Sequence, residues 1–285
     1  MGAVADDCMD PLEMIRKQTR RRGYSLRTTA TYIQCVKQFF ASCKKDPKEV
    51  TRRDVEDYLD SLLDRGVTGN TLNVHLHALK FLFEQVLGKR ITFKIKPSRK
   101  PKRLPVFLSR QEVLRLFASV ANEKHRLILE LLYSAGLRVS EVVRLRRQDL
   151  DMDQFVGWVR QGKGKKDRPF LIARCLAQKL KAHIANHCPV PDSFLFRGYH
   201  NHLSTRAVQE IINHAARKAR IDKRVHPHAL RHSFATHLIE DGHDVEEVQP
   251  LLGHASAKTT MIYVHMASPT MLSMKSPYDT MSKEG

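Results

Sequence analysis

A basic segment that contains several prolines, residues 89–107, divides this sequence into two parts. Pro97, Pro101 and Pro105 are spaced so that no helix can run through it, because proline lacks the backbone N–H that a helix interior needs. The segment holds many lysines and arginines and no acidic residue. We therefore expect an extended basic linker between two separately folded domains, and 285 residues are enough to give each domain a core.

Helical periodicity runs through residues 1–88. Apolar residues recur every three or four positions in three segments, which is the pattern of a helix with one buried face. These residues are Tyr32, Val36, Phe39 and Phe40 in the first segment, Val55, Tyr58, Leu59, Leu62 and Leu63 in the second, and Leu72, Leu76, Leu79, Phe83 and Val86 in the third. Together with a shorter helix near Leu12 and Ile15, the segments predict a small helical bundle.

Residues 108–266 have the pattern of helices around a short β-structure. Ser109 and Glu112 form a capping box for a first helix. Strands are expected at residues 155–160 and 168–172, joined by a turn rich in glycine and lysine. Further helices are expected at residues 125–134, 174–186, 204–220, 228–240, 244–252 and 256–265. The predicted fold is mainly α-helical, with a small antiparallel sheet in the second domain.

Two features near the C-terminus depart from regular helical structure. Pro250 lies within the expected helix 244–252 and predicts a kink or a shortening there. Residues 267–285 are rich in methionine and serine and contain two prolines, so we expect a loose tail.

The charge balance indicates a polyanionic partner. Lys and Arg number 49 against 30 for Asp and Glu, which gives a formal net charge of +19, and duplex DNA or RNA is the commonest partner for such an excess. No apolar run is long enough to span a membrane, and the acidic N-terminus lacks the pattern of a signal peptide. The 5 cysteines form no C-x-x-C pair, so we expect reduced thiols in a cytoplasmic protein.

Four short motifs and a tyrosine follow one another in the second domain. They are Ala135-Gly136-Leu137-Arg138-Val139-Ser140-Glu141, Gly162-Lys163-Gly164, His228-Ala229-Leu230-Arg231-His232, Leu252-Gly253-His254 and finally Tyr263. This order of Arg, Lys, His-x-x-Arg, Gly-His and Tyr resembles that of the tyrosine recombinase (phage integrase) family. The resemblance covers nearly all of residues 109–265, and residues 1–88 fit the family's helical core-binding (SAM-like) DNA-binding domain.

The resemblance implies a site that breaks a phosphodiester by transesterification, made of Arg138, Lys163, His228, Arg231, His254 and Tyr263. Tyr263 would be the nucleophile, and its ordinary pKa of roughly 10 calls for activation by nearby cations. The arginines would clamp the non-bridging oxygens, the histidines would bind the same oxygens or relay the tyrosine proton, and Lys163 would protonate the departing 5′ oxygen. Side chains would supply the charge that metal ions supply in many nucleases, so no metal or cofactor is expected.

The histidines also suggest a zinc site. His226, His228, His232 and His237 lie close together in the sequence, but the glutamate of an H-E-x-x-H motif is missing. A buried arginine beside a dication is also unfavourable. We therefore expect His232 and His237 to be structural.

Two other tyrosines and one glutamate have alternative interpretations. Tyr278 is the rival of Tyr263 as the nucleophile, whereas Tyr133 lies on an apolar helical stripe that is typical of a core. Glu141 follows Arg138 closely enough to orient its guanidinium, but capping the helix that begins there explains it equally well.

The resemblance further implies two domains that form a clamp around DNA. The basic residues expected to contact the DNA backbone are Arg99, Lys100, Lys102 and Arg103 in the linker and Lys165 and Lys166 in the turn. The expected partner is a double-stranded target site, or a folded single strand, bound by a homotetramer. Such a protein would act in the cytoplasm, at the nucleoid.

The implied activity is site-specific recombination through a 3′-phosphotyrosyl intermediate, as in the integration or excision of mobile DNA. The run Thr259-Thr260-Met261-Ile262-Tyr263 is similar to integron integrases, whereas the compact length is similar to Xer-type resolvases of chromosome or plasmid dimers. Two further classes stay open, a type IB topoisomerase and a non-catalytic DNA-binding protein. The complete set of six residues argues against the latter.

Overall fold

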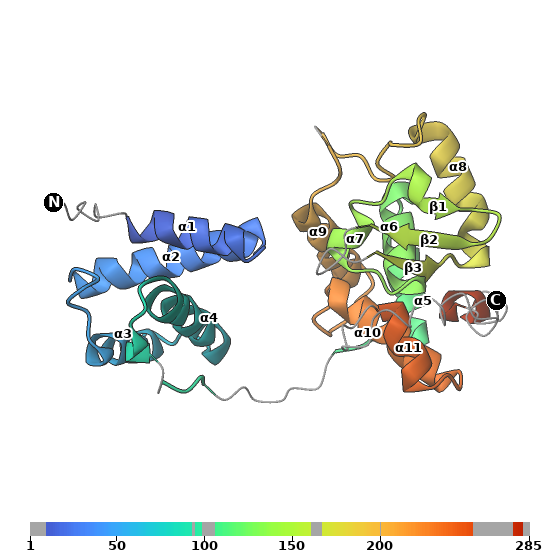
Figure 1. Ribbon diagram of the computed structural model, residues 1–285. Helices are drawn as coiled ribbons and strands as arrows, with labels where there is room; N and C mark the ends of the chain where they lie inside the picture. Colours follow the sequence, from blue (N-terminus) through green and yellow to red (C-terminus); the bar gives the residue numbers. More distant parts are fainter. Residues whose placement is uncertain are drawn as a thin grey trace. The chain divides into compact units, whose positions relative to one another are not determined.

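The computed structural model describes residues 10–92, 95–98, 106–160, 167–199, 201–252 and 276–281. The chain forms two compact units, Met1–Arg103 and Leu104–Gly285, and each has its own hydrophobic core (Figure 1). Each expected helix that falls on described residues is present, as is a small antiparallel sheet. No described helix has the length and apolar character that a membrane crossing requires.

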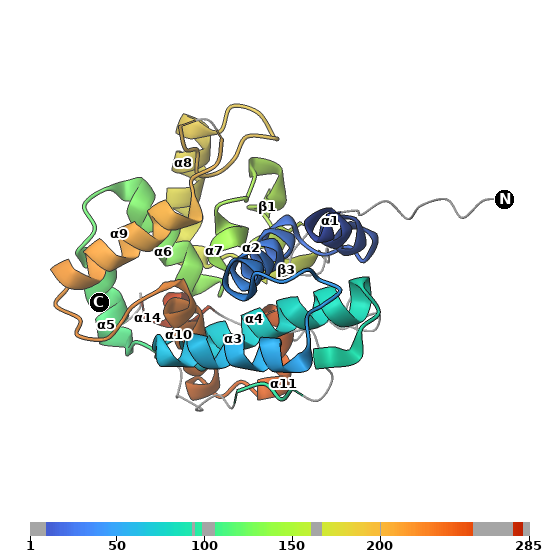
Figure 2. The ribbon, with the colours of Figure 1, turned by 90° about the vertical axis from the view of Figure 1, so that its left-hand side faces the viewer.

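The first unit is a bundle of helices, as predicted. The helices are α1 (Pro11–Arg21), α2 (Leu26–Cys43), α3 (Arg52–Asp64) and α4 (Gly69–Lys80), and a π-helical turn (Phe81–Val86) and a 3-10 turn (Arg90–Thr92) follow. Side-chain caps at Ser25, Thr51 and Thr68 start three of them. Figure 2 shows α3 beside α4, and α2 also packs on α4. Fully buried aromatic rings, Phe39 and Phe83, fill the centre of the bundle.

The second unit is built around one central helix, α6 (Glu123–Ser134), in which every residue from Leu127 to Ser134 is buried. The helices near it include α5 (Arg110–Ala118), the short α7 (Val139–Val142), α8 (Ala177–His187), α9 (Thr205–Lys218) and α10 (Pro227–Glu240). A further helix, α11 (Val245–Leu252), packs on α10. It continues through Pro250 to Leu252, although the proline removes one N–H donor.

The sheet of the second unit has three antiparallel strands in the order β1 (Leu150–Asp151), β2 (Val156–Val159) and β3 (Arg168–Leu171). The sequence did not reveal β1, because a strand of two residues has no periodicity to detect. Val159 pairs with Arg168, so β2 and β3 form an antiparallel hairpin. The connecting residues 161–166, which include Lys163, lie outside the described residues.

The expectation of a loose C-terminal tail is wrong for residues 276–281. Helix α14 (Pro277–Met281) packs on α6, and the Tyr278 ring meets Phe117 and Tyr133 edge to face. The Tyr278 hydroxyl donates to Glu130 Oε1 at 2.8 Å. A helix of 5 residues is too short for its apolar spacing to stand out in the sequence.

Candidate active site

Arg138 lies at the start of α7, directly after the turn that ends α6. Its backbone N–H donates to Glu141 Oε2 at 2.8 Å, and its guanidinium Nη1 donates to Glu141 Oε1 at 2.7 Å. Glu141 therefore caps the helix and orients the arginine, so both interpretations of this residue hold. The carboxylate is buried, but the Arg138 side chain is 18% exposed, so part of this side chain reaches the surface.

Arg231 lies on α10, is buried, and bonds two backbone carbonyls from other segments. Its Nη1 donates to the Gly136 carbonyl at 2.5 Å, and its Nη2 donates to the Leu252 carbonyl. Gly136 has a φ of +57°, and a Cβ there would lie 2.5 Å from the Phe234 ring, so only glycine fits. The turn before Arg138 is thereby joined to the end of α11.

A third arginine, Arg168, completes the cluster and was not predicted. It begins β3, and its Nη2 donates to Glu141 Oε2 at 2.6 Å while its Nη1 donates to the Leu251 carbonyl at 2.7 Å. One feature of the sequence could have indicated it, because Arg168 directly precedes the apolar run Pro169-Phe170-Leu171. A buried strand rarely begins with an arginine unless that arginine has a partner.

Two of the three guanidinium groups, those of Arg138 and Arg168, bond the buried Glu141 carboxylate, and Arg231 interacts with it through its charge. Burial alone would raise the pKa of Glu141, but the charge of Arg168 and hydrogen bonds from Arg138 outweigh burial and hold the pKa below its ordinary value. Burial, helped by the charges of Arg138 and Arg168, lowers the pKa of Arg231 to about 9. The cluster therefore carries more positive charge than Glu141 neutralises, which suits an anionic ligand.

His228 lies in the first turn of α10 and is exposed, one helical turn before Arg231. Its neighbour His226 caps the helix, because His226 Nδ1 accepts from the Ala229 N–H at 3.1 Å. His237 is buried and bonds the Tyr133 hydroxyl at 2.8 Å, as expected of a structural histidine. Among the described residues, no three His, Cys, Asp or Glu side chains come together to hold a metal ion.

Of the two other tyrosines considered, Tyr133 is buried and Tyr278 is half-buried against the core. Tyr133 has no exposed surface, as expected of a core residue, and burial raises its pKa. Burial and the Glu130 carboxylate raise the pKa of Tyr278. A phenol with a raised pKa ionises less readily, so Tyr278 is poorly suited to attack phosphorus while α14 is docked.

The remaining predicted site residues lie outside the described residues. These are Lys163, His254 and Tyr263 of the catalytic set and Arg99, Lys100, Lys102, Arg103, Lys165 and Lys166 of the expected DNA contacts. Of the catalytic set, the structure therefore places Arg138, His228 and Arg231. Arg231 binds the Leu252 carbonyl, which directly precedes Gly253 and His254.

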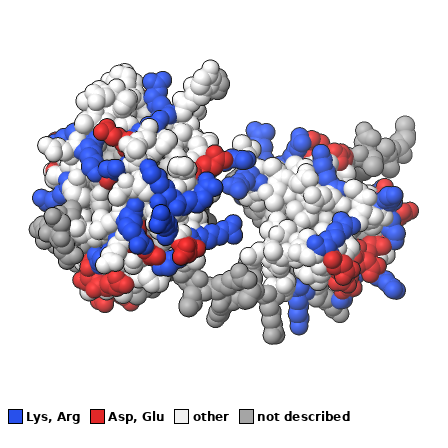
Figure 3. Space-filling model, turned by 180° about the vertical axis from the view of Figure 1, so that it is seen from behind, with Lys and Arg blue, Asp and Glu red and all other residues white. Residues whose placement is uncertain are grey.

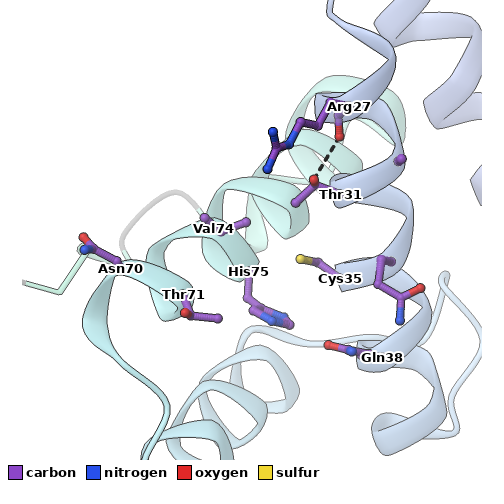
Figure 4. Close-up of a pocket in the computed structure, with 10 residues that line it drawn as sticks. Arg27, Thr31, Cys35, Gln38, Asn70, Thr71, Val74 and His75 are labelled. Carbon is purple, nitrogen blue, oxygen red and sulfur yellow. Dashed lines mark hydrogen bonds between the residues drawn. The ribbon is translucent and has the colours of Figure 1, made fainter. Parts of the chain in front are cut away.

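The first unit has an open groove of about 570 Å³ between α2 and α4 (Figure 4). Its polar lining consists of Arg27, Thr31, Gln34, Gln38, Asn70, Thr71 and His75. His75 is buried and bonds the Tyr58 hydroxyl at 3.0 Å, so it belongs to the floor of the groove. The polar groups of the lining include amide and hydroxyl side chains, and such groups hydrogen-bond base edges in DNA-binding proteins. Figure 3 shows further lysines and arginines gathered on one face of the second unit.

Comparisons with known proteins agree with these features. Residues 106–269 match the family described as "Phage integrase family", and residues 12–92 match "Phage integrase, N-terminal SAM-like domain". An integrase/recombinase of Sinorhizobium fredii, putative by name, is 34% identical, over 96% of this chain and 91% of its own length. The tyrosine recombinase XerA of Thermococcus kodakarensis is 39% identical, over 72% of this chain and 74% of its own.

A solved structure shares the fold. The site-specific recombinase XerH, bound to its difH substrate in a pre-cleavage complex, has a TM-score of 0.68 and 22% identity. The match covers 93% of this chain and 85% of the XerH chain.

Proposed function

The chain belongs to the phage integrase family and is a site-specific tyrosine recombinase, and we propose that Tyr263 is its nucleophile. In this proposal the Tyr263 hydroxyl oxygen attacks the scissile phosphorus. A 3′-phosphotyrosyl bond forms, the bond from phosphorus to the 5′ oxygen breaks, and Lys163 protonates the departing oxygen. Attack by a 5′ hydroxyl reverses these steps, so rejoining needs no nucleotide cofactor.

The observation that supports this chemistry best is the convergence of Arg138 and Arg231 around one turn. Two N–H groups of Arg231 bond backbone carbonyls, which fixes the plane of its guanidinium, and a guanidinium has further N–H groups for phosphate oxygens. Arg138, oriented by Glu141, would bind the second oxygen. His228 and His254 would hydrogen-bond the same phosphate or relay the tyrosine proton.

We propose double-stranded DNA as the substrate, gripped by both units. XerH, which shares the fold, was solved with its DNA substrate, and the net charge of +19 favours a polyanion. The two units and the basic segment 89–107 would form a clamp, with Arg99, Lys100, Lys102, Arg103, Lys165 and Lys166 on the phosphates. The groove between α2 and α4 would read base edges. A homotetramer on two sites, acting at the nucleoid, completes the proposal.

Integration or excision of mobile DNA is the role we propose, since a relative that aligns with nearly the whole chain is named an integrase/recombinase. A Xer-type role is the second candidate, supported by the identity with XerA. The two roles share the same chemistry and differ in the DNA site that is chosen.

Covalent trapping tests the proposal. The full chain is incubated in EDTA with a pool of nicked duplexes and hairpins and denatured in SDS, and the DNA that stays attached is sequenced. We expect adducts on one short motif with the wild type and with Tyr278→Phe, and none with Tyr263→Phe. Adducts on all sequences would indicate a topoisomerase. DNA binding without adducts would indicate a non-catalytic DNA-binding protein.

A further inference from the structure

We propose that Arg168 is a positioning residue that holds three parts of the active site in register. The proposal rests on the function proposed above and extends it to a residue outside the six predicted ones. Its basis is geometric, because one buried guanidinium joins Glu141 on α7 to the end of α11, and the backbone of the same residue begins β3.

The first link passes through Glu141 to Arg138. Glu141 Oε2 accepts from Arg168 Nη2 at 2.6 Å and from the Arg138 backbone N–H, while Oε1 accepts from the Arg138 guanidinium. The Glu141 side chain is 5% exposed, so water cannot readily replace a missing partner. Without Arg168, the carboxylate loses its closest buried counter-charge, and the orientation of Arg138 is no longer fixed.

The second link is to the end of α11. Leu251 and Leu252 are the last two residues of that helix, where carbonyls lack partners within the helix. Arg168 binds the Leu251 carbonyl and Arg231 binds the Leu252 carbonyl, so two arginines cap the helix side by side. The chain continues from this point into Gly253 and His254, so the cap sets where the His254 segment begins.

The third link is to the hairpin of Lys163. Arg168 pairs with Val159 at the ends of β2 and β3, which the segment of residues 161–166, with Lys163, connects in the sequence. The residue whose side chain ties Glu141 to α11 therefore also pairs, through its backbone, with β2 at the base of the hairpin.

The described contacts of the Arg168 side chain join separate segments of the protein. Its side chain is only 9% exposed, and both terminal nitrogens bond protein atoms. Its Nε is buried with no hydrogen-bond partner among the described residues. Arginine suits the position because its planar fork reaches the carboxylate and the carbonyl at once, whereas a lysine amine is a single point charge.

Single-turnover cleavage tests the proposal. The rate of covalent adduct formation is measured with the full chain at saturating concentration on a nicked duplex that carries the site found by trapping. We expect Arg168→Gln to cleave about 100-fold more slowly than the wild type, because small misplacements of catalytic groups cost that much. DNA affinity should not change, and Arg168→Lys, which keeps the charge, should recover part of the rate.

A double variant separates positioning from a general loss of structure. If Arg168 acts through Glu141, the double variant Arg168→Gln, Glu141→Gln should be no slower than the slower single variant. Effects that multiply, or a wild-type rate for Arg168→Gln, would overturn the proposal.

Arg110→Gln is the matched control, because Arg110 also bonds a carboxylate, that of Asp241, and a carbonyl, that of His237, but on the α5 side of the unit. We expect it to lower the melting temperature and leave the cleavage rate unchanged. If Arg110→Gln lowered the cleavage rate as much as Arg168→Gln does, the Arg168 effect would be explained by loss of stability, and the proposal would be refuted. If the wild type itself forms no adduct, the proposed function fails first, so the two failures are distinct.

Discussion

The Gly136 carbonyl, in the turn after α6, accepts a 2.5 Å hydrogen bond from the buried guanidinium of Arg231 on α10. The bond joins the turn that precedes Arg138 to the helix that carries Arg231. The turn can approach so closely because Gly136 has no side chain and a positive φ. The spacing between the two proposed phosphate ligands therefore depends on one glycine.

Gly136→Ala should destabilise the second unit by about 2–4 kcal/mol, since the methyl group clashes with Phe234 and alanine resists a positive φ. Cleavage should fall together with stability, because Arg231 loses its anchor. Chemical denaturation gives the free energy of unfolding. Gly66→Ala is the control, since Gly66 has a similar φ but nothing within 4 Å, and it should cost only about 1–2 kcal/mol. Equal losses at both positions would show that the clash is unimportant.

Tyr278→Phe should lower the free energy of unfolding by about 1–3 kcal/mol, because Glu130 is buried and loses one of the two donors that the described residues supply. The other donor, Lys179, is half exposed. Thermal or denaturant unfolding measures the change. The exposed Tyr24 supplies the control variant Tyr24→Phe, which should leave stability nearly unchanged. No difference between the two variants would mean that the hydrogen bond from Tyr278 to Glu130 does not stabilise the unit.

The protein should lose stability as the pH falls below about 6.5, the ordinary pKa of histidine. Burial first, and the charge of Arg110 second, lower the pKa of His237 in the folded state, while Glu240 and Asp241 oppose the shift. Its contribution is complete above the unfolded pKa and is lost as the pH falls through the lower folded pKa. Melting temperatures between pH 8 and pH 5 should therefore decline less in His237→Gln than in the wild type. The exposed His214, replaced in His214→Gln, should not change the slope.

DNA affinity should fall steeply with salt, because each phosphate contact releases condensed counterions. Replacing Arg99, Lys100, Lys102 and Arg103 by glutamine should reduce the slope of log affinity against log salt by up to about 0.9 for each phosphate that the protein no longer neutralises. Fluorescence anisotropy over a salt series measures the slope. If the fourfold variant had the same slope as the wild type, these four residues would not contact phosphates, and the linker would not be part of the proposed clamp.

The groove between α2 and α4 should govern sequence preference and not overall affinity for DNA. Gln38→Ala and Asn70→Ala remove amides that line it, so binding should discriminate less between the target and single-base variants, by about 1–3 kcal/mol for each bidentate amide–base pair that is removed. The salt slope should not change. Gln18→Ala, on α1 and outside the lining, is the control. Undiminished discrimination in the groove variants would place base readout elsewhere.

Much of the fold could be predicted from the sequence, because long helices with one apolar face repeat their pattern over many residues. The short elements could not. The two residues of β1 have no period, and α14 is recognisable only from where Tyr278 and Met281 pack in three dimensions.

The candidate site was also predictable only in part. The motifs brought Arg138, His228 and Arg231 to attention because their order along the chain is distinctive. Nothing in that order indicates that Arg231 bonds backbone carbonyls or that Arg168 shares Glu141, since both depend on contacts between segments far apart in the sequence.

Arg138, Arg168 and Arg231 lie near one carboxylate, that of Glu141, so one negative charge faces three positive charges. The repulsion between the arginines lowers the stability of the folded second unit. Stability and affinity for phosphate are then linked equilibria, because a bound anion relieves the repulsion that the folded chain otherwise bears. A polyanionic substrate acts on such a protein as a stabilising ligand, and the tightest target sites stabilise it most. The enzyme should resist heat and proteolysis best when it is loaded on the DNA that it is about to cut.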